Sequence, residues 1–174
     1  MRHAKDRRLK ARQALCRAVI PLALLLGGGT VLAQEKSQEQ TSPVAVFEKY
    51  GLLGTWAVDC DSRATPDNNY QVYRALDDGR VQYDAMDSPT RRTEVGVVES
   101  AVEVGPQDIQ YTGVIQFKGR EYSWLTTIRV DGNHRRTMDW VENGKKRIAA
   151  GRYTDMRDNG AFRGKPTPWK HRCE

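Results

Sequence analysis

The stretch of sequence that decides the fold is IQYTGVIQFKGREYSWLTTIRV, residues 109–130. Apolar and polar side chains alternate along each half of this stretch, and Gly119 lies between the halves. A period of two is typical of a β-strand that buries one face, and a glycine between two such runs is typical of a tight turn. We therefore expect an antiparallel pair of strands here. Their inward faces are expected to be Ile109, Tyr111, Gly113, Ile115 and Phe117 on the first strand and Tyr122, Trp124, Thr126, Ile128 and Val130 on the second.

Strand-forming runs continue on both sides of this hairpin. Asp-Gly and Asn-Gly pairs at 78–79, 131–132 and 143–144 favour further hairpin turns. Short connections make antiparallel neighbours, and closure of such a sheet removes its exposed edges. We expect an all-β fold, an eight-stranded antiparallel up-and-down barrel, with a β-sandwich as the alternative. The expected strands are 54–60, 70–76, 81–86, 93–104, 109–118, 121–130, 135–141 and 146–153.

A short helix and an irregular tail are expected to flank the strands. Ser42 and Pro43 are typical of the N-cap and the first residue of a helix. Residues 154–174 include two glycines and two prolines, so this tail is not expected to be a strand throughout. We expect it to wrap the outside or the bottom of the barrel, with Trp169 packed there. Residues 42–174 would then form a single domain.

Residues 1–33 have the pattern of a cleavable export signal. Seven basic residues among the first 17 precede an apolar run at 18–26, and small or apolar residues end at Ala33. The run is shorter than the roughly 20 residues of a membrane span, so we expect cleavage after Ala33 and no stable membrane anchor. An uncleaved anchor is the alternative. We expect a periplasmic or secreted protein in which the polar residues 34–41 are a disordered lead-in.

The positive charge of the chain lies in this signal. The sequence has 28 Lys and Arg against 22 Asp and Glu, and residues 34–174 hold 21 of each. A formally neutral mature chain has no global field that would attract nucleic acid or an anionic membrane, so neither is an expected partner. The basic residues Arg135, Arg136 and 145–147 are expected to meet across one hairpin. They would form an anion-binding patch or an edge kept soluble by charge, and we favour the edge.

The cysteines, and the absence of catalytic, metal-binding and nucleotide-binding motifs, limit the chemistry that the sequence predicts. Cys60 and Cys173 are the two cysteines after the signal, and an even pair in an oxidising compartment predicts a disulfide, with two free thiols as the alternative. Only His134 and His171 follow residue 33, and the sequence has no metal-binding cluster, nucleophile elbow or nucleotide-binding fingerprint. We therefore expect a non-catalytic protein without a metal or a cofactor.

An aromatic set on the predicted inward faces is the main candidate for binding. It could line an apolar pocket whose hydroxyls orient a small hydrophobic or amphipathic ligand. It could also fill the interior, because an eight-stranded barrel is about wide enough for side chains alone, and the bulk of these residues favours that interpretation. The candidate pocket residues are Tyr83, Tyr111, Tyr122, Trp124, Met138 and Trp140.

Two resemblances add to these expectations. Gly54-Thr55-Trp56 resembles the Gly-x-Trp opening of the lipocalin and wider calycin group, although the Thr-Asp-Tyr motif of that group is absent. The resemblance implies a lipocalin-like barrel in which Trp56 closes the bottom and stacks under an arginine, here Arg152 or Arg157. Residues 54–60 and 166–173 also resemble the ends of a group of small exported alphaproteobacterial proteins, which implies export and the disulfide.

Together these features predict a non-catalytic exported binding protein. One hypothesis is a binder of a small ligand inside the barrel. The alternative is a protein-binding module, such as an inhibitor of a periplasmic protease or lysozyme, which would use residues 34–41 or the exposed turns. An enzyme ranks last because the sequence shows neither a nucleophile motif nor a set of metal ligands.

Overall fold

The computed structural model describes residues 41–154 and 162–174. The predicted signal peptide, the lead-in up to residue 40 and Arg157 lie outside the described residues. Within the described ranges, no helix combines the length and the apolar character that crossing a membrane requires.

Strands make up most of this part of the chain, and their order in the sheet follows the sequence from β1 to β9. Each neighbouring pair along that order is antiparallel. The strands are β1 (Gly54–Ala57), β2 (Tyr70–Ala75), β3 (Val81–Met86), β4 (Arg92–Glu103), β5 (Asp108–Phe117), β6 (Arg120–Asp131), β7 (His134–Glu142), β8 (Lys145–Ala149), β9 (Arg152–Tyr153) and β10 (Lys170–Cys173).

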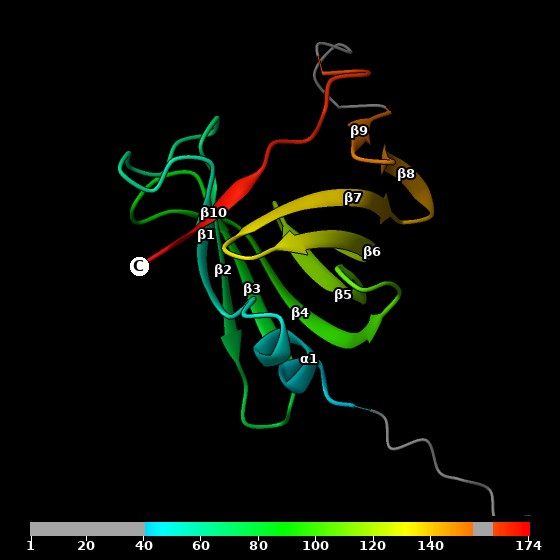
Figure 1. Ribbon diagram of the computed structural model, residues 1–174. Coiled ribbons are helices and arrows are strands. Elements are labelled where there is room, and N and C mark those ends of the chain that lie inside the picture. The colour runs from blue at the N-terminus through cyan, green and yellow to red at the C-terminus, as the bar shows by residue number, and fades with distance from the viewer. Residues whose placement is uncertain (1–40, 155–161) are drawn as a thin grey trace, which may run out of the picture. The chain divides into compact units, whose positions relative to one another are not determined.

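The sheet closes into the predicted eight-stranded antiparallel barrel. Strand β10 pairs with β1 on one side and with the start of β7 on the other, which joins β1–β7 and β10 into one ring of described strands (Figure 1). Lys170 lies opposite Arg135, and Cys173 lies opposite Thr55. Because the sheet closes on itself, the alternative of a two-layer β-sandwich is excluded.

The strand that completes the ring differs from the predicted one. Residues 146–153 were expected to be the last barrel strand, but Ala150 and Gly151 adopt left-handed φ angles of 47° and 70° and split this run into β8 and β9. These two strands extend the sheet beyond β7 and do not reach β1. The tail follows β9, where the Tyr153 N–H donates to the Lys165 carbonyl at 3.1 Å, and then enters the ring as β10.

The strand alternation is as predicted in the central hairpin and interrupted in β7. Ile109, Tyr111 and Ile115 of β5 are buried, as are Trp124 and Ile128 of β6. In β7, Asp139 pairs with Thr127 and Thr137 pairs with Ile128. Met138 is therefore an extra residue without a partner on β6, which is a β-bulge.

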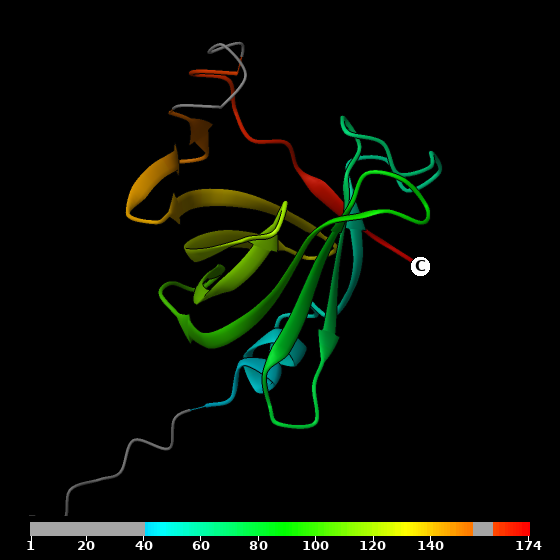
Figure 2. The ribbon, with the colours of Figure 1, turned by 180° about the vertical axis from the view of Figure 1, so that it is seen from behind.

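The helix α1 (Pro43–Lys49) begins as predicted. The Ser42 hydroxyl accepts a hydrogen bond from the Ala45 N–H at 3.3 Å, and Pro43 stands in the first turn. The helix lies across one end of the barrel beside the β2–β3 turn, where the Val44 N–H donates to the Gly79 carbonyl at 3.1 Å (Figure 2). Its buried Phe47 ring contacts Tyr73 and Tyr111, with ring centroids 5.2 and 5.4 Å away, so α1 plugs this end.

The two ends of the domain are joined by the predicted disulfide. Cys60 and Cys173 form it with their Cα atoms 5.4 Å apart, closing a loop with a sequence separation of 113 residues. Its position beside the β1–β10 pair holds the last strand against the first. The covalent bond therefore supports the closure of the barrel at the point where only short strands pair.

Candidate ligand-binding cavity

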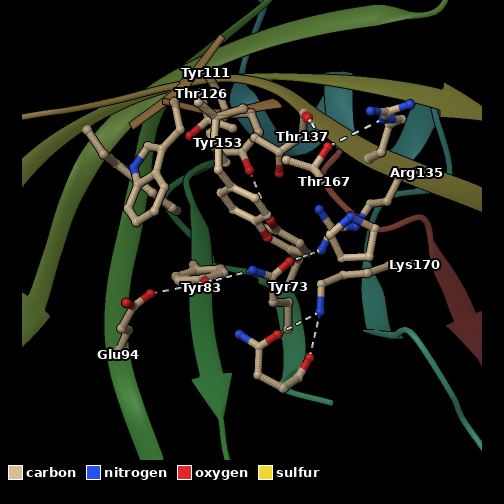
Figure 3. A pocket seen from close by; sticks show the side chains of 17 residues that line it. Tyr73, Tyr83, Glu94, Tyr111, Thr126, Arg135, Thr137, Tyr153, Thr167 and Lys170 are labelled. Carbon is tan, nitrogen blue, oxygen red and sulfur yellow. Dashed lines mark hydrogen bonds between the residues drawn. The ribbon is translucent and has the colours of Figure 1, made fainter. Parts of the chain in front are cut away.

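The barrel interior is filled on the helix side and contains a partly open cavity of about 280 Å³ beyond it (Figure 3). Strands β2–β10 and the tail all contribute to its wall. The lining residues are Asn69, Gln71, Tyr73, Tyr83, Glu94, Tyr111, Trp124, Thr126, Arg135, Arg136, Thr137, Trp140, Ile148, Tyr153, Thr167, Pro168 and Lys170.

Four of the six predicted pocket residues line this cavity, namely Tyr83, Tyr111, Trp124 and Trp140. Tyr122 does not; it lies two residues before Trp124 on β6 and packs, half-buried, against the core. Met138 does not line it either. The bulge reverses the alternation in β7, so that Thr137 and Trp140 both line the cavity and Met138 does not.

The aromatic wall is tightly packed and carries hydroxyl groups. Tyr83 and Trp124 have ring centroids 4.8 Å apart, and Tyr111 and Trp124 have theirs 5.4 Å apart. The hydroxyl oxygens of Tyr73 and Tyr111 are 2.9 Å apart, while the Tyr83 hydroxyl donates to Glu94 Oε2 at 3.2 Å. Burial raises the pKa of both Tyr83 and Tyr111 well above the usual value, so both hydroxyls stay protonated.

Gly113 makes room for this wall. A Cβ atom at Gly113 would lie 2.0 Å from the Val97 carbonyl oxygen and 2.5 Å from Trp124 Nε1. The missing side chain therefore allows the Trp124 indole to approach the β5 backbone closely.

Arg135 is a buried cation, and its burial was not predicted from the sequence. It was assigned to a charged surface edge with Arg136 and residues 145–147, but its exposed fraction is 1%. Its guanidinium carbon lies 5.2 Å from the centroid of the Trp56 ring and 5.0 Å from that of Tyr73, and Nη2 donates to Gln71 Oε1. The sequence pattern did not predict this burial because of the bulge. Unbroken alternation from Trp140 would place the side chain of residue 135 outside the barrel.

Arg135 also occupies the place that the lipocalin resemblance implied for Arg152 or Arg157. Trp56 donates its indole N–H to the Leu52 carbonyl at 2.8 Å, and the cation over its ring is Arg135. Arg152 is exposed and donates to the Gly164 carbonyl at 2.9 Å, away from Trp56. Arg157 lies outside the described residues.

Lys170 is a second buried cation in the wall, and the sequence analysis did not single it out. It has an exposed fraction of 8%, and its Nζ donates to the backbone and side-chain oxygens of Asn69 at 2.6 and 2.8 Å. Burial, reinforced by the charge of Arg135, lowers the pKa of Lys170 from 10.5 to about 7. The two residues are cross-strand neighbours, since Lys170 of β10 lies opposite Arg135 of β7.

The charges in the wall are unbalanced. Arg135, Arg136 and Lys170 line the cavity together with one carboxylate, Glu94, which lies on the opposite side from Arg135 and Lys170 in Figure 3. Neither Arg135 nor Lys170 forms an ion pair with any residue in the described ranges. Arg136 donates to the Gly151 carbonyl at 2.7 Å.

The wall also has more hydrogen-bond donors than acceptors. Three buried side-chain nitrogens in the described part of the chain have no acceptor: Trp124 Nε1, Arg135 Nε and Trp140 Nε1. All three belong to residues that line the cavity. Buried polar groups are nearly always paired, and an unpaired one costs about 1–3 kcal/mol. These three nitrogens are buried within the wall and are not part of the surface that a ligand would contact.

Within the described ranges, no group of three or more His, Cys, Asp or Glu side chains is placed to hold a metal ion. The exposed rings of His134 and His171 meet edge to face, with ring centroids 4.7 Å apart. Comparison with protein-family models, with curated proteins and with solved structures finds no match to this chain. The cavity geometry is therefore the basis for any functional assignment.

Proposed function

We propose that this protein is an exported, non-catalytic binding protein that holds one small amphipathic molecule inside its barrel. The observation that carries the proposal is the cavity of about 280 Å³, whose wall combines packed aromatic rings with two buried cations, Arg135 and Lys170. Small-molecule sites are typically concave and mostly apolar, with a few polar groups that fix the ligand's orientation.

The cavity volume sets the size of the ligand. A cavity of about 150 Å³ is large enough for benzene. A cavity of about 280 Å³ therefore suits a molecule on the order of ten non-hydrogen atoms, such as a single substituted ring. Tyr83, Tyr111 and Trp124 would contact its apolar body, and the donors on the opposite wall would contact its polar group.

Export is supported by two features. Residues 1–33 have the pattern of a cleavable signal. Cys60 and Cys173 form a disulfide, a bond that persists in the periplasm and outside the cell and is rare in the cytosol. We therefore infer that the protein meets its ligand outside the cytoplasm.

Filling the cavity tests the proposal. Thr126 and Thr127 are neighbours on β6, and only Thr126 lines the cavity, while Thr127 accepts a hydrogen bond from Gln110 at 3.3 Å. Native mass spectrometry of protein isolated from its own compartment should show a retained small molecule on the wild type and on Thr127→Phe. Thr126→Phe should lack it, because the phenyl ring occupies the same space.

Two outcomes would contradict the proposal. One is a wild-type protein that carries no small molecule, and the other is a Thr126→Phe variant that retains it unchanged. Thermal unfolding followed by circular dichroism checks that both variants are folded. A polypeptide that copurifies equally with all three proteins would instead favour the protein-binding module.

A further inference from the structure

We propose that the ligand is a small organic acid whose carboxylate lies between Arg135 and Lys170. This inference deepens the proposed function and rests on it, because it assigns a chemical class to the ligand of the same cavity. The two cations lie opposite each other on β7 and β10, and both are at least nine-tenths buried.

One free donor and one buried charge on this wall favour a carboxylate. Arg135 Nε has no acceptor among the described residues but is fully buried, so Arg135 would act on the ligand through its charge. Lys170 carries three N–H donors when it is charged, and Asn69 accepts from it through two oxygens, which leaves one donor. A carboxylate oxygen would accept a hydrogen bond from this donor, and Arg135, which lies opposite Lys170 on β7, would stabilise the negative charge.

The surrounding charges favour an anion over a neutral or cationic ligand. A buried cation without a counter-ion is unfavourable, and a bound carboxylate would remove that imbalance. Across the cavity, Glu94 would repel a second negative charge placed there. A molecule with one carboxylate near Arg135 and an uncharged body toward Glu94 fits both sides.

The body of the ligand would lie against the aromatic wall. Tyr83, Tyr111 and Trp124 present ring edges and faces there, and an aromatic or alicyclic ring would pack on them.

A pair of matched probes tests the assignment. 4-Hydroxybenzoate and 4-hydroxybenzamide have almost the same shape and differ in charge. Isothermal titration calorimetry of the disulfide-bonded mature protein at pH 6 should show the acid binding at least about tenfold more tightly than the amide, because hydrogen bonds to charged partners are stronger. Phenyl phosphate should bind less tightly than the acid.

Lys170→Met is the variant that tests the residues, because Arg135 also packs on Trp56 and Tyr73 and its removal would disturb the core. The variant should lose about tenfold in affinity for the acid and keep its affinity for the amide. A purely structural role of Lys170 would reduce both affinities equally. Lys165→Met, the same change at an exposed tail residue, should alter neither.

The outcomes separate the two proposals. Equal affinity for acid and amide, tighter binding of phenyl phosphate, or an unchanged ratio in Lys170→Met would overturn the carboxylate assignment. If none of the probes binds and native mass spectrometry identifies a retained neutral molecule, the assignment fails and the binding function stands. If no probe binds and no molecule is retained, both proposals fail.

Discussion

The buried Lys170 makes a strong prediction about how stability depends on pH. Its pKa is lowered from 10.5 to about 7, mainly by burial. Between these values the unfolded chain binds a proton at this residue that the folded protein has largely released. Unfolding therefore takes up a proton, and the free energy of unfolding rises with pH through this window. Below pH 7 the penalty of the buried charge is fully present, and above 10.5 it is gone.

The size of the effect follows from the same two values. At about 1.36 kcal/mol for each pKa unit, the whole shift corresponds to about 5 kcal/mol. Between pH 7 and pH 9.5, linkage gives Lys170 a contribution of about 3 kcal/mol to the rise in stability. Lys170→Met lacks this contribution. Relative to the variant, the wild-type protein should therefore gain about 3 kcal/mol over this interval.

Urea denaturation followed by tryptophan fluorescence measures this difference. Both proteins are unfolded at several pH values from 7 to 9.5, with the disulfide intact and without added ligand. Tyr83 and Tyr111, whose pKa values burial raises, are present in both proteins, so their titration cancels in the comparison. Parallel stability profiles for wild type and Lys170→Met, with a difference that stays constant to within about 1 kcal/mol, would refute this reasoning.

Two further predictions concern the frame of the barrel. The Cys60→Ser, Cys173→Ser double variant should lose about 5 kcal/mol, since the bond closes a loop with a separation of 113 residues. Reducing agent should lower wild-type stability in urea to the same level and leave the variant unchanged; equal sensitivity of both would contradict this. Gly113→Ala should cost about 1–3 kcal/mol and shift the fluorescence of Trp124, because a Cβ there overlaps Val97 and the indole. Gly105→Ala, whose Cβ would be 3.4 Å from the nearest atom, is the control, and an equal loss in both would rule out the clash.

The parts of the fold that sequence predicts are those that depend on local rules. The alternation of Ile109–Val130 gives the inward faces of β5 and β6 because one side of the sheet is buried over most of its length. Gly79 and Gly144 mark hairpin turns because both adopt left-handed φ angles, 82° and 74°. The N-cap at Ser42 follows from an equally short pattern, whereas the pairing of Cys60 with Cys173 follows from their being the two cysteines after residue 33.

Closure of the barrel depends on non-local contacts and was predicted only in outline. The four-residue strand β10 follows Pro168 in a tail rich in turn residues, so no local periodicity marks it. Its place is decided by the pairing of Cys173 with Thr55 and by the disulfide. Residues 146–153 have the better strand pattern, but the left-handed turn at Ala150 directs β9 away from β1.

The residues of the candidate site likewise include some that the sequence predicts and some that it does not. The aromatic residues Tyr83, Tyr111 and Trp124 were found because large rings on an inward face are an ordinary signal of burial. Arg135 and Lys170 were missed because both residue types usually lie at the surface, and because the bulge at Met138 reverses the phase of β7. The charged residues of the cavity wall can therefore be identified only once the pairing of β7 with β10 is known.

The Lys170→Met variant distinguishes a role of Lys170 in stability from a role in ligand binding. If Lys170 only supported the fold, Lys170→Met would lower both stability and ligand affinity. The structure argues for opposite changes, because at pH 7 the lysine keeps much of a burial penalty of about 5 kcal/mol that methionine avoids, while two hydrogen bonds to Asn69 return only part of it. The variant should therefore unfold at a higher urea concentration at pH 7 and bind 4-hydroxybenzoate more weakly. Such a trade of stability for function is expected at a binding site, and a variant that loses both would point to a structural role for Lys170.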